Sequence, residues 1–142
     1  LKYPTGPVKK VGEGYMQEFQ DGILTRNPDG SNQVVHGAIG AKYKDMGGAE
    51  SALGFPTSGE NAVNGGFFQT FEKGSIYWSP KTGAHYILKS KIMDRWGQAG
   101  WEQGEFGWPT SDYSEIAAGG LSQEFQHGKI SEVLGQVRTE KK

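Results

Sequence analysis

The sequence of 142 residues contains no cysteine, no long apolar run and no excess of either charge. The absence of cysteine excludes disulfides, thiolate nucleophiles and zinc–thiolate sites. No apolar stretch approaches the roughly 20 residues that a membrane-spanning helix needs. With 15 basic and 16 acidic residues, the chain also lacks the dense basic patch that nucleic acid binding requires. We therefore expect neither a membrane span nor a nucleic acid partner.

Motifs that carry catalysis or bind metals are missing as well. The sequence has no Gly-x-Ser-x-Gly elbow, no His-Glu-x-x-His and no phosphate-binding loop. His36, His85 and His127 occupy different positions in the repeat described below, so they do not indicate one repeated catalytic position. Residues 27–31 resemble the start of a calcium loop but lack the acidic residue that closes one. We expect no enzyme activity, no cofactor and no metal.

The composition is that of a turn-rich globular protein. Glycine occurs 23 times, aromatic residues make up 12% and hydrophobic residues 35% of the chain. A chain of this length suits one domain, spanning residues 1–142. It begins at Leu1 with neither an initiator Met nor an apolar leader, which indicates a processed or excised fragment.

Two motifs recur in phase along the chain. An apolar residue, a variable one, an aromatic, a proline and a threonine occur at 1–5, 53–57 and 106–110, with the prolines 52 and 53 residues apart. A second pattern, Gln-x-Phe-x-x-Gly-x-(Leu/Ile), follows at 17–24, 69–76 and 123–130. A period of this length is typical of a tandem repeat in which neighbouring units bury one another's apolar faces. We divide the chain into repeats 1–52, 53–105 and 106–142, the third one partial.

Each full repeat is expected to contain a small antiparallel meander and one short helix, and the third copy, in which Ser131 to Arg138 lack the pattern of the middle copy, is expected to lack the helix. In the middle copy, residues 67–71 and 75–79 predict a hairpin and residues 84–88 a third strand. Ile92 and Trp96 then share a helical face, as Ile39 and Tyr43 do in the first copy. The fold class is therefore β-rich α+β, with the repeats stacked in approximate rotational symmetry.

Two positions of the second motif carry structural predictions. We expect Phe19, Phe71 and Phe125 to be buried at equivalent places in three superposable hairpins. The glycine of the same motif closes a three-residue hairpin loop, where a positive φ favours glycine. We therefore expect positive φ at three residues, namely Gly22, Gly74 and Gly128.

The motif Leu53-Gly54-Phe55-Pro56 spells the signature of the LGFP repeat, and the chain resembles this family over nearly its whole length. The middle copy also resembles the family pattern at Gly65-Gly66, at 79–85 and at 92–96. The other copies depart from it at three positions: Lys2 replaces the glycine of the signature, Glu13 the first glycine of the pair, and Phe106 the leucine.

What the resemblance implies is binding without catalysis. Repeats of this family occur in exported proteins of actinobacteria, often after a mycolyltransferase or a peptidoglycan-cleaving domain. The resemblance therefore implies an extracellular module that tethers such a protein to cell-wall polysaccharide, either arabinogalactan or peptidoglycan. A mycolyltransferase or peptidoglycan hydrolase domain, adjoining or separate, is the second partner that it implies.

Five side chains are the candidate ligand-binding residues: Tyr77, Trp78, His85, Trp101 and Trp108. The four aromatic ones border turns and glycines, and aromatic planes can bind the C–H faces of sugar rings, while His85 can hydrogen bond to hydroxyls. Packing in the core is the alternative for the aromatics, and a structural hydrogen bond is the alternative for His85. Gln17, Gln69 and Gln123, present in every copy, either satisfy loop backbone groups or repeat a ligand donor.

Two other functions compete with glycan binding. A protein-interaction or structural module of the cell envelope would expose a broad flat apolar patch. A glycan-active enzyme would need two carboxylates facing each other across a cleft.

Overall fold

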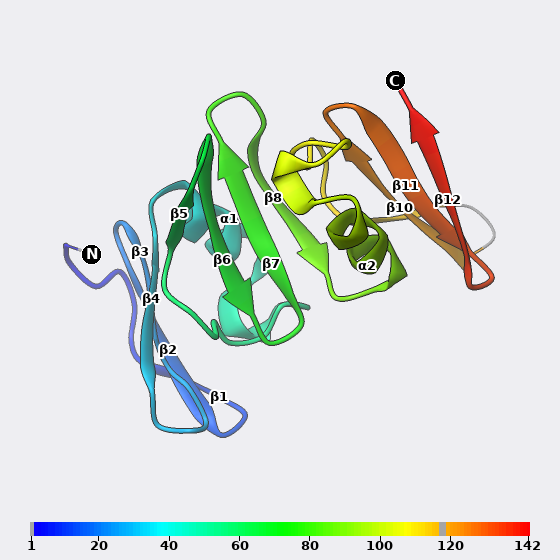
Figure 1. Ribbon diagram of the computed structural model, residues 1–142. Coiled ribbons are helices and arrows are strands. Elements are labelled where there is room, and N and C mark those ends of the chain that lie inside the picture. Colours follow the sequence, from blue (N-terminus) through cyan, green and yellow to red (C-terminus); the bar gives the residue numbers. More distant parts are fainter. Residues whose placement is uncertain (1, 117–118) are drawn as a thin grey trace.

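The computed structural model describes residues 2–116 and 119–142, so Leu1 of the first corner motif lies outside the described residues. Three four-stranded antiparallel meanders follow one another along the chain and lie side by side in that order (Figure 1). The first contains β1 (Lys9–Val11), β2 (Gly14–Phe19), β3 (Gly22–Arg26) and β4 (Asn32–His36). The second contains β5 (Asn61–Val63), β6 (Gly66–Phe71), β7 (Gly74–Ser79) and β8 (Gly83–Leu88). The third contains β9 (Ser114–Ile116), β10 (Gly120–Phe125), β11 (Gly128–Val133) and β12 (Gln136–Lys141).

Helices follow the first two sheets. They are α1 (Gly37–Met46) and α2 (Lys91–Gln98), and each leads into a short 3-10 turn, η1 (Gly48–Glu50) or η2 (Trp101–Gln103). The Ser90 hydroxyl caps α2 by accepting from the backbone N–H of Met93. The expected β-rich class, with repeated meanders and short helices, is confirmed.

The number of strands differs from the prediction. Each sheet has one more strand than expected, because short first strands precede the predicted hairpins, and the third copy adds β12. The partial third copy has no helix within residues 136–142. Gly47 ends α1 in a left-handed conformation, whereas α2 continues through Gly97 to Gln98.

The prediction of positive φ at Gly22, Gly74 and Gly128 is wrong, because all three lie outside that region. The register pairs Phe71 directly with Gly74, so the loop has two residues and the glycine begins the return strand. Close approach explains the glycines of the second and third copies. A Cβ on Gly74 would overlap the Ile87 carbonyl oxygen and lie 2.9 Å from Cδ2 of Leu53. Phe106 occupies the same place over Gly128.

The corner motif joins consecutive copies. Gly54 has a φ of 76°, and its carbonyl accepts a 2.7 Å hydrogen bond from the Tyr43 hydroxyl of the preceding helix. Phe55 packs against Gly14 of the preceding sheet. The third copy repeats these contacts, because the Trp96 indole donates to the carbonyl of Gly107 at 3.0 Å and Trp108 lies against Gly66.

Two apolar cores result, and each lies between consecutive sheets. The first is formed around Tyr43 and α1, the second around Trp96 and α2. Phe71 and Phe125 are buried as predicted, packed on Tyr43 at 4.8 Å and on Trp96 at 5.2 Å between ring centroids. Phe19 is only half-buried, because no helix of a preceding copy covers it among the described residues.

Candidate functional site

The five candidate residues occupy different environments. Tyr77 and Trp108 belong to the second core, with exposed fractions of 6% and 7%. Trp78 is half-buried, stacks on Phe67 and packs on the first core. Trp101 is 42% exposed. His85 is the cross-strand partner of Tyr77, but its ring nitrogens lie in a polar cluster with Asp112 and Thr82, so the five residues differ in burial and in the groups that they contact.

A cavity of about 540 Å³ opens on the second sheet, between the face that carries Tyr77 and the segment that begins with α2. Aromatic and apolar side chains form its walls, and hydroxyl and charged groups line the rest. The lining residues are Thr57, Phe68, Thr70, Phe71, Gly74, Ser75, Tyr77, Lys89, Met93, Trp101 and Glu102. A concave apolar site with a few polar groups is the usual form of a small-ligand site.

Trp101 adopts a backbone conformation that costs free energy. Its φ is 59°, in the left-handed region where a bulky residue is rarely found. The equivalent residue of the first copy is Gly48, whose φ of 63° carries no such penalty. Gly97 makes room for the indole, since a Cβ there would lie 2.7 Å from the Trp101 ring. The second copy thus presents an exposed indole at the cavity where the first copy has a glycine.

The cavity has room because the two copies differ at a second equivalent position. Ser75 lines the cavity, whereas Ile23 occupies the equivalent position of the first copy. Ile23 is fully buried there and reaches, together with Met16, to the place where a Cβ of Gly48 would lie. The first copy therefore fills with side chains the space that the second copy leaves open.

The polar groups of the cavity can both donate and accept hydrogen bonds. The Thr57 and Thr70 hydroxyls lie 2.9 Å apart at its edge. Burial, with a smaller contribution from the Glu102 carboxylate, raises the pKa of Tyr77 above its ordinary value, so its hydroxyl stays protonated at neutral pH. Lys89 adds a cation and Glu102 an anion.

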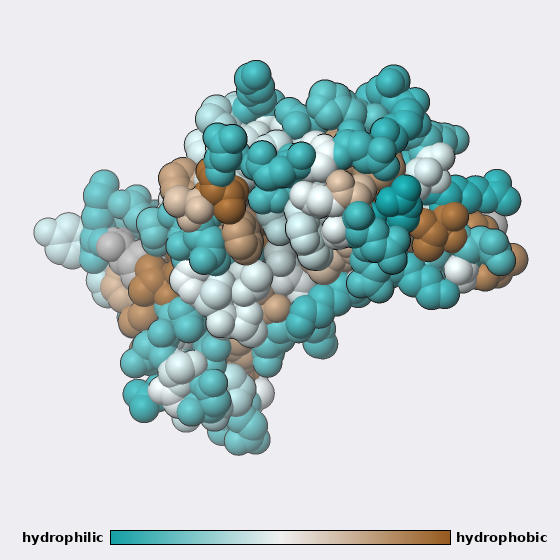
Figure 2. Space-filling model, viewed as in Figure 1, coloured by the Kyte–Doolittle hydropathy of each residue, from teal (hydrophilic) through white to brown (hydrophobic). Residues whose placement is uncertain are grey.

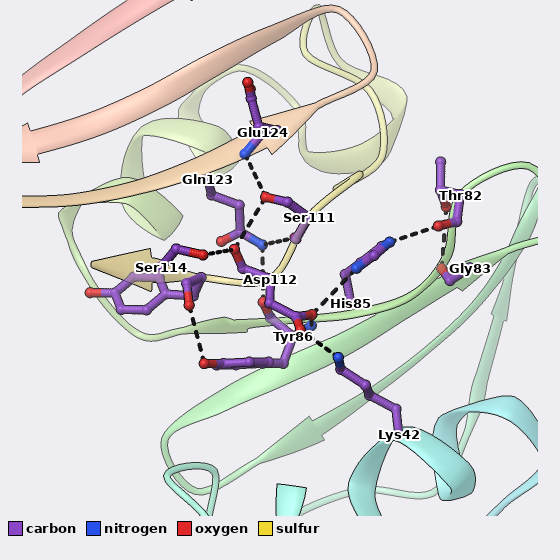
Figure 3. Close-up of polar contacts among 11 residues, drawn as sticks. Lys42, Thr82, Gly83, His85, Tyr86, Ser111, Asp112, Ser114, Gln123 and Glu124 are labelled. Carbon is purple, nitrogen blue, oxygen red and sulfur yellow. Dashed lines mark hydrogen bonds and ion pairs between the residues drawn. The ribbon is translucent and has the colours of Figure 1, made fainter. Parts of the chain in front are cut away.

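The cluster around His85 joins all three copies (Figure 3). Asp112 of the third copy pairs with Lys42 of α1, and its Oδ1 lies 3.3 Å both from Nδ1 of His85 and from the backbone N–H of Tyr86. Nε2 of His85 lies 2.7 Å from the carbonyl oxygen of Thr82. Both ring nitrogens therefore face oxygen acceptors, and an imidazolium can donate to both. We interpret the cluster as a structural contact, because its groups bind one another.

The repeated glutamines hold loops and strand edges. The Gln69 amide donates to the carbonyl oxygens of Ser58 and Val34, and Gln123 donates to those of Ser111 and Tyr86. Among the residues described, Gln17 donates to the carbonyl of Gly6 alone. These contacts support the structural interpretation of the three glutamines.

Sequence reasoning missed several cavity residues, among them Phe68, Ser75, Met93 and Glu102. A comparison between copies could have found Ser75 and Trp101, because they replace Ile23 and Gly48 at equivalent positions. Within residues 2–116 and 119–142, no cluster of acidic and histidine side chains could hold a metal ion. None of the helices described is long and apolar enough to cross a membrane.

Comparison with known families identifies the repeat. The family model described as LGFP repeat matches residues 1–51 and 53–104. A search of curated proteins finds no match to the chain.

Proposed function

The chain belongs to the LGFP repeat family, and from this premise we propose that it binds cell-wall polysaccharide, arabinogalactan or peptidoglycan, without catalysis. Through this binding it anchors an exported protein to the envelope. We place the module outside the cell, in contact with the wall. The protein that it anchors is a mycolyltransferase or a peptidoglycan hydrolase, in the same chain or in another one.

The proposal rests on the strained backbone and the exposed indole of Trp101. Strained backbone persists where the surrounding structure enforces it, often at functional sites. Here the strain holds a large indole, 42% exposed, at the mouth of a cavity also walled by Phe68 and Tyr77. A sugar ring can bind its C–H face to the indole through dispersion and desolvation. The hydroxyls of Thr57 and Thr70 and the charges of Lys89 and Glu102 can bind the sugar hydroxyls.

The face seen in Figure 2 gives less support to the protein-interaction alternative than to glycan binding. The face seen in Figure 2 is mostly hydrophilic, and its apolar residues form small separate patches rather than a broad flat one. Single exposed apolar residues of this kind are normal on soluble proteins.

The first copy supplies the variants for a test. Trp101→Gly and Ser75→Ile install the residues of the first copy, so one removes the indole and the other fills the cavity. Each is compared with wild type by retention on intact purified wall and on arabinogalactan-free peptidoglycan. Phe67→Ala is the matched control, because Phe67 is also an exposed aromatic, at 36%, but does not line the cavity.

We expect both cavity variants to lose retention while their melting temperatures stay close to that of wild type, and Phe67→Ala to bind normally. The comparison of the two wall fractions identifies the polysaccharide. If both cavity variants are retained like wild type, or if the protein ignores wall glycans and captures an envelope protein, the interaction module replaces this proposal.

A further inference from the structure

A second, smaller cavity of about 240 Å³ lies where the first copy meets the second. Its first-copy side is the turn between β3 and β4, with Asn27, Asp29 and Ser31, together with Gln33 of β4. Its second-copy side consists of Thr57 and Glu72. The Asn27 amide donates to the carbonyl of Pro56 at 2.6 Å, which fixes the turn of one copy against the corner motif of the next.

The two cavities adjoin along the corner motif and its hairpin. Thr57 lines both of them. Phe71 lines the larger cavity, and the next residue, Glu72, lines the smaller one. Thr57 is exposed and forms part of the wall of both cavities. A ligand on Trp101 can therefore extend past Thr57 into the smaller cavity.

The chemistry of the smaller cavity differs from that of the larger one. Its polar lining consists of amide, hydroxyl and carboxylate groups, and the described lining residues include no Lys, Arg or His. Asp29 accepts from the backbone N–H and the hydroxyl of Ser31, and these hydrogen bonds lower its pKa, so its carboxylate is charged at neutral pH. Glu72 accepts from the backbone N–H of Phe55 at 2.9 Å. Such a site can accept hydrogen bonds from sugar hydroxyls and repels anions.

We propose that the two cavities are adjacent subsites for an oligosaccharide of at least two units without anionic groups. One sugar ring packs on Trp101 in the larger cavity, and the next unit hydrogen bonds to Asp29 and Gln33 in the smaller one. This inference rests on the proposed function, because it adds a second subsite to the same glycan site. It makes the junction of the first two copies, rather than the second copy alone, the binding unit.

The test measures dissociation constants by calorimetry and by intrinsic tryptophan fluorescence, with Trp101→Gly identifying the signal of Trp101. The probes are two neutral series of one to four units, namely oligosaccharides from purified arabinogalactan and chito-oligosaccharides, with digalacturonate as the anionic disaccharide. In the series that binds, affinity should rise about tenfold from one unit to two, the equivalent of one or two hydrogen bonds. Affinity should then change little with length, and digalacturonate should gain nothing over the single unit.

Two variants isolate the smaller cavity. Gln33→Ala removes an amide for which the fold shows no hydrogen bond among the described residues, and Asp29→Asn keeps an oxygen that can accept from Ser31. Both should reduce the two-unit gain to less than about threefold, with single-unit binding unchanged, and Asp29→Asn should also improve binding of digalacturonate.

The failures of the two proposals can be distinguished. If the gain in affinity from one unit to two is missing, or if it survives both variants, the second subsite is overturned. Single-unit binding at Trp101 then still supports the proposed function. If neither series binds at any length, both proposals are wrong.

Discussion

The side-chain amide of Gln69 donates a 3.1 Å hydrogen bond to the carbonyl oxygen of Val34, across the boundary between the first and second copies. The same amide donates to Ser58 of its own copy at 2.8 Å. One buried side chain thus satisfies both a strand edge of the preceding sheet and the loop that covers it.

Gln69→Ala should lower the free energy of unfolding by about 1–3 kcal/mol, because it removes a buried side chain and leaves two part-buried carbonyl groups without this donor. Gln17→Ala is the matched control. Its amide is half-buried and makes one hydrogen bond within its own copy, so the loss should be less than about 1 kcal/mol. Chemical denaturation measures both, and equal losses would contradict the role assigned to the interface bond.

Phe71→Ala should lower the free energy of unfolding by about 3–5 kcal/mol, since it deletes a ring buried between Tyr43 and the second sheet. Phe19→Ala should cost about 1–2 kcal/mol, because the equivalent ring of the first copy is only half-buried. Urea denaturation of the two variants gives the comparison. Similar costs would mean that the preceding helix contributes little to the burial of this phenylalanine.

Lys2→Gly should raise the melting temperature. Lys2 has a φ of 65° at the position where the other copies have Gly54 and Gly107, and this conformation costs a residue with a Cβ about 1 kcal/mol. The ion pair to Asp21 that would be lost is exposed and contributes little. The reverse change, Gly54→Ala, should destabilise, because its Cβ would lie 2.5 Å from Oε1 of Glu72. An unchanged or lower melting temperature for Lys2→Gly would refute the strain argument.

The stability that Asp112 contributes should depend on pH. Burial raises the pKa of this carboxyl, but the hydrogen bond from His85 and the hydrogen bond and charge of Lys42 outweigh it, so the pKa lies below its ordinary value of 3.8. A lowered pKa in the folded state means that the contribution is present above pH 3.8 and is lost as pH falls through the folded-state value. The difference in melting temperature between wild type and Asp112→Asn should therefore be largest above pH 4 and shrink below it. A difference independent of pH would show that the charge is not what stabilises.

The parts of the fold that follow from local patterns could be predicted. The hairpins around Phe71 and Phe125, both helices and the repeat period depend on periodicity and turn residues, which lie close together in sequence. The short first strands were missed because three residues such as Asn61–Val63 show no alternation. The role of Gly74 was mistaken because the constraint comes from Leu53 and Ile87, which are neighbours in space only.

Part of the lining of the larger cavity could be predicted. Aromatic residues next to turns identified Trp101 and Tyr77, but their different burial depends on how α2 lies against the second sheet. The contact between Lys42 and Asp112 joins residues 70 positions apart, and no local pattern indicates such a pair. The cavity itself depends on the small side chain of Ser75, at a position where the first copy has Ile23.

The linear arrangement of the sheets has a mechanical consequence. The first and third sheets lie at opposite ends of the row (Figure 1), so tension between the ends of the module passes through both junctions in series. Lys42 of the first copy reaches past the second sheet to Asp112 of the third, so this ion pair spans both junctions. Each junction also has bonds of its own: Tyr43 donates to Gly54 at the first, and Trp96 donates to Gly107 at the second. A load on the ends of the module is therefore shared between these bonds and the ion pair, and a glycan held by both cavities would add a brace at the first junction.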